Sequence, residues 1–204
     1  MRDKLNNLES KYPRIDYEVW FSLLDIPKED IEKRIELAEK LESVYFWLFN
    51  LITVSVLANE YIDTDSLIAS VQYRLSDIAD LDARYVSDHI VRFADETVRA
   101  TVDNADDPFF LSDERATTLA ADEAHTLCSY EELQEAYDNG MTRKTWNTQH
   151  DRRVRKSHVA ADGQTVPRDK MFNINGYEMA TVKDTENGAP LSEVSNCRCW
   201  VTFS

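Results

Sequence analysis

Residues 26–62 read IPKEDIEKRIELAEKLESVYFWLFNLITVSVLANEYI, and this stretch decides the first half of the fold. Pro27, followed closely by two acids, suits the first turn of a helix, where proline loses no hydrogen bond and carboxylates favour the positive end of the helix dipole. From Ile31 onward, apolar residues recur every three or four positions, which is typical of an amphipathic helix. The segment Val44–Ala58 is then apolar on nearly all sides. We expect one long helix with a buried second half.

The uncharged stretch Ser43–Asn59 raises the alternative of a membrane span. It is 17 residues long, at the lower limit for crossing a bilayer, and it contains Asn50, Thr53 and Ser55. The clusters of Lys and Arg that often flank membrane helices are missing on both sides. The sequence therefore favours a buried central helix, covered by its own domain or by a partner subunit, and predicts no membrane partner.

The helical pattern extends well beyond this segment. Neither glycine nor proline occurs from Lys28 to Asp107, a run of 80 residues, so nothing there removes a backbone donor or favours a left-handed turn. Apolar spacing predicts three further helices, over residues 66–79, 83–103 and 113–139. We expect Asp65 or Ser66 to cap the first of these, and Ser112–Asp113 to cap the last.

Composition changes near Gly140. All four glycines lie from that residue onward, as in a turn-rich or β-containing unit. The chain carries 38 Asp and Glu against 23 Lys and Arg, a net charge of −15, yet residues 143–204 contain 10 Lys and Arg against 7 Asp and Glu. We infer an acidic helical part followed by a mildly basic part. A protein this acidic is not expected to coat nucleic acid or an anionic membrane with its whole surface.

Two segments of the basic part alternate as strands do. Arg143–Trp146 and Asn196–Phe203 are predicted to pair, with Thr165–Pro167 as a further extended piece and a short helix over His150–Ala160. The predicted fold class is therefore α+β: a mainly α-helical N-terminal part followed by a small C-terminal α+β module with a short antiparallel sheet.

Six cations gather in one part of this module. If residues 150–160 are helical, Arg152, Arg155 and Lys156 share one side. Such a face is either solvated or paired with the protein's own acids, which we favour, or it contacts phosphate. The candidate phosphate contacts are Arg143, Lys144, Arg152, Arg153, Arg155 and Lys156.

Three residues of the module are of metal-ligating types: His158, Cys197 and Cys199. His150 or Asp151 would complete a set of four. Against a metal, C-x-C is not the usual zinc spacing, and alternate residues of a strand point to opposite faces. We therefore predict no metal and no cofactor, with the cysteines packed in the core and His158 in a structural hydrogen bond.

Enzyme signatures are missing from the sequence. It contains no phosphate-binding glycine loop, no H-E-x-x-H and no G-x-S-x-G. Cys197 with His158 is the one conceivable nucleophile and base, but only two arginines favour a thiolate there. His89 and His125 are expected at polar or half-buried helix positions, and Cys128 in the core.

The number of cysteines and the N-terminal residues indicate the cellular compartment of the protein. Three cysteines, two of them crowded at Cys197 and Cys199, are too few for a disulfide framework, which favours a reducing compartment. Residues 1–14 lack the apolar core of a secretory signal, so we expect none.

Taken in order, these residues resemble the C-terminal domain of the phage Mu F-like head morphogenesis proteins, also called minor capsid proteins. That family's pattern is an R-A-x-x-(I/L)-A-x-x-E helix, a Lys-x-Trp, an Asp followed by Arg and then His, a D-G-Q turn near a Pro, and a closing N-C-R-C. The resemblance covers about residues 112–202, and the C-x-x-C that some members carry in the Asp-Arg-His region is missing here. The matching positions are Arg115, Glu123, Lys144, Trp146, Asp151, Arg155, His158, Asp162, Gly163, Gln164, Pro167, Asn196, Cys197, Arg198 and Cys199.

The resemblance implies a structural role. It divides the chain into an acidic helical region (1–111) and a Mu F-like domain (112–204), the latter made of a linking helix at about 112–139 and a small module at about 140–204. It implies a tailed-phage head protein without catalytic activity, located in the virion and, during assembly, in the host cytoplasm. Expected partners are the portal protein, the major capsid or scaffold protein and packaged DNA. The alternatives are a DNA-contacting or ejected accessory protein and an enzyme or toxin-like module.

Overall fold

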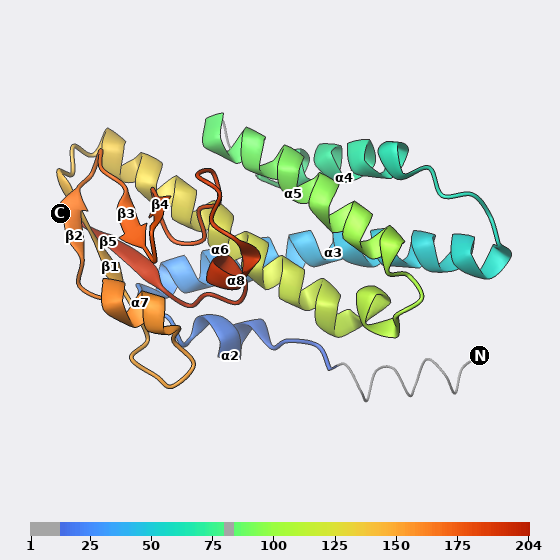
Figure 1. Ribbon diagram of the computed structural model, residues 1–204, viewed down its shortest axis with the longest axis horizontal. Helices are drawn as coiled ribbons and strands as arrows, with labels where there is room; N and C mark the ends of the chain where they lie inside the picture. Colours follow the sequence, from blue (N-terminus) through green and yellow to red (C-terminus); the bar gives the residue numbers. More distant parts are fainter. Residues whose placement is uncertain (1–12, 80–83) are drawn as a thin grey trace. The chain divides into compact units, whose positions relative to one another are not determined.

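The computed structural model describes residues 13–79 and 84–204 (Figure 1). The segment expected to lack a secretory signal therefore lies mostly outside the described residues, as does the first residue of the predicted helix 83–103. The helical part contains α2 (Tyr17–Phe21), α3 (Lys28–Ala58), α4 (Thr64–Ala79), α5 (Arg84–Asp103), the 3-10 turn η1 (Pro108–Leu111) and α6 (Asp113–Asp138). The rest contains β1 (Arg143–Asn147), α7 (Lys156–Ala161), β2 (Thr165–Pro167), β3 (Phe172–Ile174), β4 (Tyr177–Met179), α8 (Leu191–Val194) and β5 (Trp200–Phe203).

The four long helices confirm the helical predictions, and the α+β fold class is confirmed with them. The caps agree in part. The hydroxyl of Ser112 accepts a hydrogen bond from the amide of Arg115 at 3.2 Å, as predicted for α6. The cap of α4 is Asp63 rather than Asp65 or Ser66, because the carboxylate of Asp63 accepts the amide of Ser66 at 3.2 Å.

The chain forms two compact units. Among the described residues, one consists of residues 13–17, 35–79 and 84–124, and the other of residues 18–34 and 125–204. Both α3 and α6 contribute residues to each unit. The predicted domain boundary between residues 111 and 112 stays a prediction.

The core of the first unit is built on the second half of α3. Tyr45, Leu48 and Ile52 of α3 are fully buried, and α4 packs against α5 (Figure 1). The expected burial of α3 is incomplete, since Val54 and Leu57 are 60% and 64% exposed. By length and composition α3 is apolar enough to cross a bilayer, a test that the core helix of a soluble protein also passes.

The second unit contains both sheets. In the three-stranded sheet the order is β2-β1-β5, and all pairs are antiparallel. Trp146 of β1 lies opposite Val201 of β5, so the predicted pairing of these strands is confirmed. A second sheet, the β3-β4 hairpin, was not predicted. Its turn is Asn175–Gly176, where both residues have positive φ (56° and 90°), as a tight hairpin turn requires.

The expected helix over His150–Ala160 is wrong in its first half. His150 has a φ of 54°, and the carboxylate of Asp151 accepts the amides of Arg153 (2.8 Å) and Val154 (3.2 Å). These side-chain bonds replace helical ones and form a turn. Helix α7 begins only at Lys156, so Arg152, Arg155 and Lys156 do not share a helix face.

The expected strand over Asn196–Phe203 is also shorter than predicted. Asn196 has a φ of 53°, which an extended strand does not allow, and β5 begins only at Trp200. Cys197 and Cys199 therefore lie in a loop, and the alternation of a strand does not apply to them.

Candidate functional site

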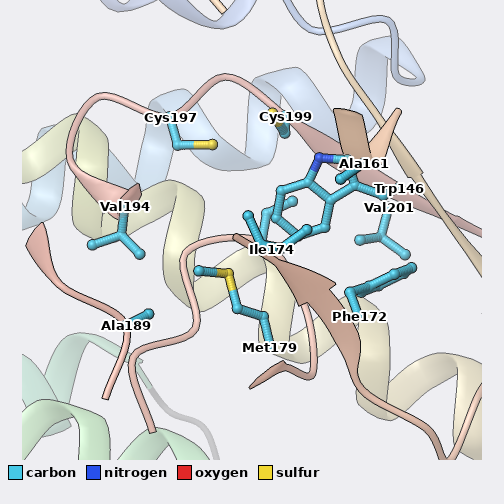
Figure 2. Close-up of a cluster of buried hydrophobic side chains, with 11 residues drawn as sticks. Trp146, Ala161, Phe172, Ile174, Met179, Ala189, Val194, Cys197, Cys199 and Val201 are labelled. Atoms are coloured by element: carbon cyan, nitrogen blue, oxygen red, sulfur yellow. The ribbon is translucent and has the colours of Figure 1, made fainter. Parts of the chain in front are cut away.

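Trp146 is the centre of the hydrophobic core of the second unit. Its indole is fully buried and meets the rings of Phe172 and His158 edge-on, at centroid distances of 5.4 and 5.5 Å. It belongs to one buried cluster with Ile174, Met179, Val182, Val194, Val201 and the two cysteines, most of which Figure 2 labels. The Trp of the Lys-x-Trp motif thus holds the module together.

Lys144 lies two residues before Trp146 and is buried on the same side of β1. Its ammonium donates a hydrogen bond to the carbonyl of Ala180 at 2.5 Å and lies 5.0 Å above the ring of Phe172. Burial lowers the pKa of Lys144 from 10.5 to about 8. Because the ammonium of Lys144 is buried and bonded inside the protein, it is not available to bind phosphate at the surface.

His158 of α7 faces both cysteines of the closing motif. Its Nδ1 atom lies 3.2 Å from Sγ of Cys199 and 3.5 Å from Sγ of Cys197, and all three residues are buried. Its Nε2 atom lies 3.3 Å from Oε2 of Glu193, a residue that the sequence analysis missed. Glu193 in turn accepts hydrogen bonds from Ser157 (2.8 Å) and Asn175 (2.9 Å).

The two cysteines differ in acidity. A hydrogen bond from Cys199 lowers the pKa of Cys197 well below its usual value, and His158 acts in the same direction against the effect of burial. Donation to Cys197, together with burial, raises the pKa of Cys199. The first proton lost from the pair is therefore that of Cys197.

A cavity of about 20 Å³ adjoins His158 and both cysteines, and residues 153–155 also line it. A space of this size holds about one water molecule. It is too small for an organic substrate, so the cluster is a packed polar centre inside the module.

Other motif residues fix the loop that carries the cysteines. The guanidinium of Arg155 donates to the carbonyl of Ser195, and that of Arg198 donates to both carboxylate oxygens of Asp151, at 2.8 and 3.1 Å. Gly163, with a φ of 74°, donates its amide to the carbonyl of Trp146 at 2.8 Å. The Asp-Arg-His pattern therefore positions the N-C-R-C segment.

His125 completes this arrangement, although the sequence predicted only a polar or half-buried helix position for it. It is fully buried: its Nε2 atom donates to the carbonyl of Cys199 at 2.8 Å, and Nδ1 accepts from Nε of Arg34 at 3.2 Å. Burial lowers the pKa of His125 well below its usual value, and the charges of Arg34 and Lys183 lower it further. The ring is therefore neutral.

The helical motif residues Arg115 and Glu123 belong to the other unit. Arg115 donates to Thr101 (2.8 Å) and to the carbonyl of Phe110 (2.9 Å), and burial lowers its pKa to about 10. Both carboxylate oxygens of Glu123 lie within 3.0 Å of Nε2 of His89. These residues stabilise the helices and take no part in the cysteine cluster.

Of the six candidate phosphate contacts, four are exposed. Lys144 is buried and Arg155 holds Ser195, so neither offers its charge to a ligand. The exposed residues are Arg143, Arg152, Arg153 and Lys156.

Comparison with known proteins agrees with the motif. Residues 81–202 match the family described as Phage Mu protein F like protein, which is more than half of the chain. This match identifies the class of protein as phage head morphogenesis proteins. Within that class, the chain belongs to the phage Mu protein F-like family. The match begins earlier than the motif resemblance at residue 112 and takes in α5. No curated protein and no solved structure matches the chain.

Proposed function

We propose that the protein is a minor head protein of a tailed phage that acts in head assembly at the portal and the inner face of the capsid. The observation that carries this proposal is the family match over residues 81–202. On this proposal the protein lies in the virion and, during assembly, in the host cytoplasm. Its partners are then the portal protein and the major capsid or scaffold protein.

The burial of the motif residues supports a structural role without catalysis. Trp146, His158, Cys197 and Cys199 are each at most 2% exposed, and their neighbours are held by hydrogen bonds inside the module. A cavity that holds one water gives a substrate no access. This favours the head-protein role over the enzyme or toxin-like alternative.

The experiment is quantitative mass spectrometry of purified proheads and mature heads of the phage that encodes the chain. We expect a few copies per particle, and capture of the portal, capsid or scaffold protein by the tagged chain. The protein's absence from both kinds of particle, with normal heads when its gene is deleted, would contradict the proposal.

A second candidate function is contact with packaged DNA. It is supported by the exposed cations Arg143, Arg152, Arg153 and Lys156, to which the structure gives no ion-pair partner within residues 13–79 and 84–204. Affinity for duplex DNA should fall steeply with salt, and replacing Arg152, Arg153 and Lys156 by Gln should flatten that dependence. The exposed Arg99→Gln serves as the matched control. No binding at about 50 mM salt would rule this function out.

A further inference from the structure

Three buried donor atoms converge on one point in the second unit. Nδ1 of His158 and the sulfur atoms of Cys197 and Cys199 all lie within 4.8 Å of one another. We propose that these residues form a zinc site with three protein ligands and a water molecule as the fourth. The site goes beyond the role in head assembly and does not depend on it.

The spacing of the donor atoms fits tetrahedral zinc. With Zn–S at about 2.3 Å and Zn–N at about 2.0 Å, a thiolate sulfur and an imidazole nitrogen on one tetrahedral ion are about 3.5 Å apart. The distances from Nδ1 of His158 are 3.2 Å to Cys199 and 3.5 Å to Cys197. The two sulfurs lie within 4.8 Å of each other, and on one tetrahedral ion they would be about 3.8 Å apart.

The imidazole is oriented as in a metal site. Nε2 of His158 faces Glu193 at 3.3 Å, and that carboxylate is fixed by Ser157 and Asn175. With its proton on Nε2, the ring directs the lone pair of Nδ1 at the two sulfurs. A carboxylate behind a ligating histidine is the usual outer partner of zinc, which it stabilises by raising the basicity of the ring.

Alternate residues of a strand point to opposite faces, which counts against Cys197 and Cys199 as ligands of one ion. This objection does not apply, because both residues lie in a loop. Residues 196–199 precede β5, and the sulfurs of Cys197 and Cys199 lie near each other and near His158. Figure 2 shows both cysteines on this loop. Two hydrogen bonds also hold the loop, from Arg155 to the carbonyl of Ser195 and from His125 to the carbonyl of Cys199. A C-x-C pair on such a loop can ligate one ion with both sulfurs.

Neither His150 nor Asp151, which the sequence offered as a fourth ligand, can fill that position. The side chain of His150 is 73% exposed and lies near Asp162, while the carboxylate of Asp151 is held by Arg198. The adjoining cavity of about 20 Å³ has room for one water. Binding replaces two thiol protons by Zn²⁺, so two H⁺ are released and the complex of two thiolates, one imidazole and one water is neutral.

A nucleophilic cysteine is the competing interpretation of the same pair. Cys197 and Cys199 are each 2% exposed, and the cavity beside them admits no organic substrate. Attack on a substrate carbon requires access that this arrangement does not give. Metal ligation requires only an ion and a water, so the geometry favours it.

The test is made on the full-length chain produced in zinc-supplemented medium and purified without chelator. We expect close to one zinc per chain by elemental mass spectrometry. After removal of zinc, titration with Co²⁺ should give sulfur-to-cobalt charge-transfer bands and the strong visible bands of a tetrahedral site. The variants Cys197→Ser and Cys199→Ser should lose both signals, while Cys128→Ala, which removes the third buried cysteine, should keep them.

Two further measurements keep the proposal testable if a variant does not fold. In the native wild type, a thiol reagent should modify the cluster cysteines at least tenfold faster after chelation. Glu193→Gln should retain the Co²⁺ spectrum with about 10-fold to 100-fold weaker affinity. Wild-type protein without zinc and without a Co²⁺ spectrum overturns the site, as does fast modification of one cysteine that chelation does not change.

Discussion

His125 donates a hydrogen bond from Nε2 to the carbonyl oxygen of Cys199 at 2.8 Å, and this bond fixes the backbone of the loop that carries both cluster cysteines. Arg34 donates to the other ring nitrogen at 3.2 Å, so both nitrogens of a fully buried ring are paired. Arg34 itself is held by Glu132 at 2.6 Å. The chain of contacts joins α3, α6 and the loop inside one unit.

Replacing His125 by Ala should destabilise the protein strongly. The variant leaves Nε of Arg34 and the carbonyl of Cys199 without their buried partner and opens a cavity where the ring was. We expect a loss of about 2–4 kcal/mol in the free energy of unfolding. Urea unfolding followed by tryptophan fluorescence measures it. His150→Ala is the control, because that ring is 73% exposed; equal effects of the two substitutions would contradict the proposed role of His125.

Arg115 should not be replaceable by lysine. Its guanidinium bonds to Thr101 and Phe110 and lies over the rings of Phe49 and Phe110, at 5.1 and 4.8 Å. A lysine ammonium cannot keep the planar stacking together with both bonds. We expect both Arg115→Ala and Arg115→Lys to lower the free energy of unfolding by more than about 1.5 kcal/mol.

The control for Arg115 is Arg99→Ala. Arg99 is half exposed and pairs with Asp95 at 3.0 Å, so its loss should change the free energy of unfolding by less than about 1 kcal/mol. Full stability of Arg115→Lys in thermal and urea unfolding would show that only the charge matters.

The long helices could be predicted from the sequence because their signal is local. Apolar residues spaced by three or four positions, with no glycine or proline from Lys28 to Asp107, leave little alternative to helices. The pairing of β1 with β5 followed from alternation in both segments. The β3-β4 hairpin was missed because strands of three residues carry almost no periodicity, although Asn175–Gly176 is a strong turn signal.

For the site, the sequence indicated which residues are of ligand types but not that they lie close together. Cys197, Cys199 and His158 stood out as ligand types, but their convergence depends on the positive φ of Asn196, which no periodicity reveals. Glu193 and His125 were missed because their partners lie far away in sequence. For His125, a polar residue between the apolar positions Ala124 and Leu127 is a signal of burial that is visible in hindsight.

Gly163 should tolerate asparagine better than alanine. Its φ is 74°, and a Cβ at this position would meet no atom within 4 Å, so the cost of substitution lies in the backbone alone. Left-handed geometry costs alanine about 1 kcal/mol, and asparagine less. We expect Gly163→Ala to be less stable than Gly163→Asn by several tenths of a kcal/mol or more. The two midpoints of urea unfolding measure this difference, and the opposite order would show that a side-chain clash governs the site.

Lys144 should make stability depend on pH in alkaline solution. Burial lowers its pKa from 10.5 to about 8, so the folded protein releases this proton at a lower pH than the unfolded chain does. Below about pH 8 both states hold the proton, and the cost of burying the charge is fully present. Between about pH 8 and 10.5 the unfolded chain binds more protons, so the contribution of Lys144 to the free energy of unfolding rises with pH.

Lys144→Met removes this titration while keeping the length of the side chain, and the quantity to measure is the difference in unfolding free energy between wild type and variant. Tyrosines and cysteines titrate in the same range, but they are common to both proteins and cancel in the difference. We expect the wild type to gain stability relative to Lys144→Met as the pH rises from 8 to 10. The exposed Lys170→Met should show no such trend. A difference for Lys144→Met that is flat or falls with pH would mean that the ammonium is as stable in the core as in water.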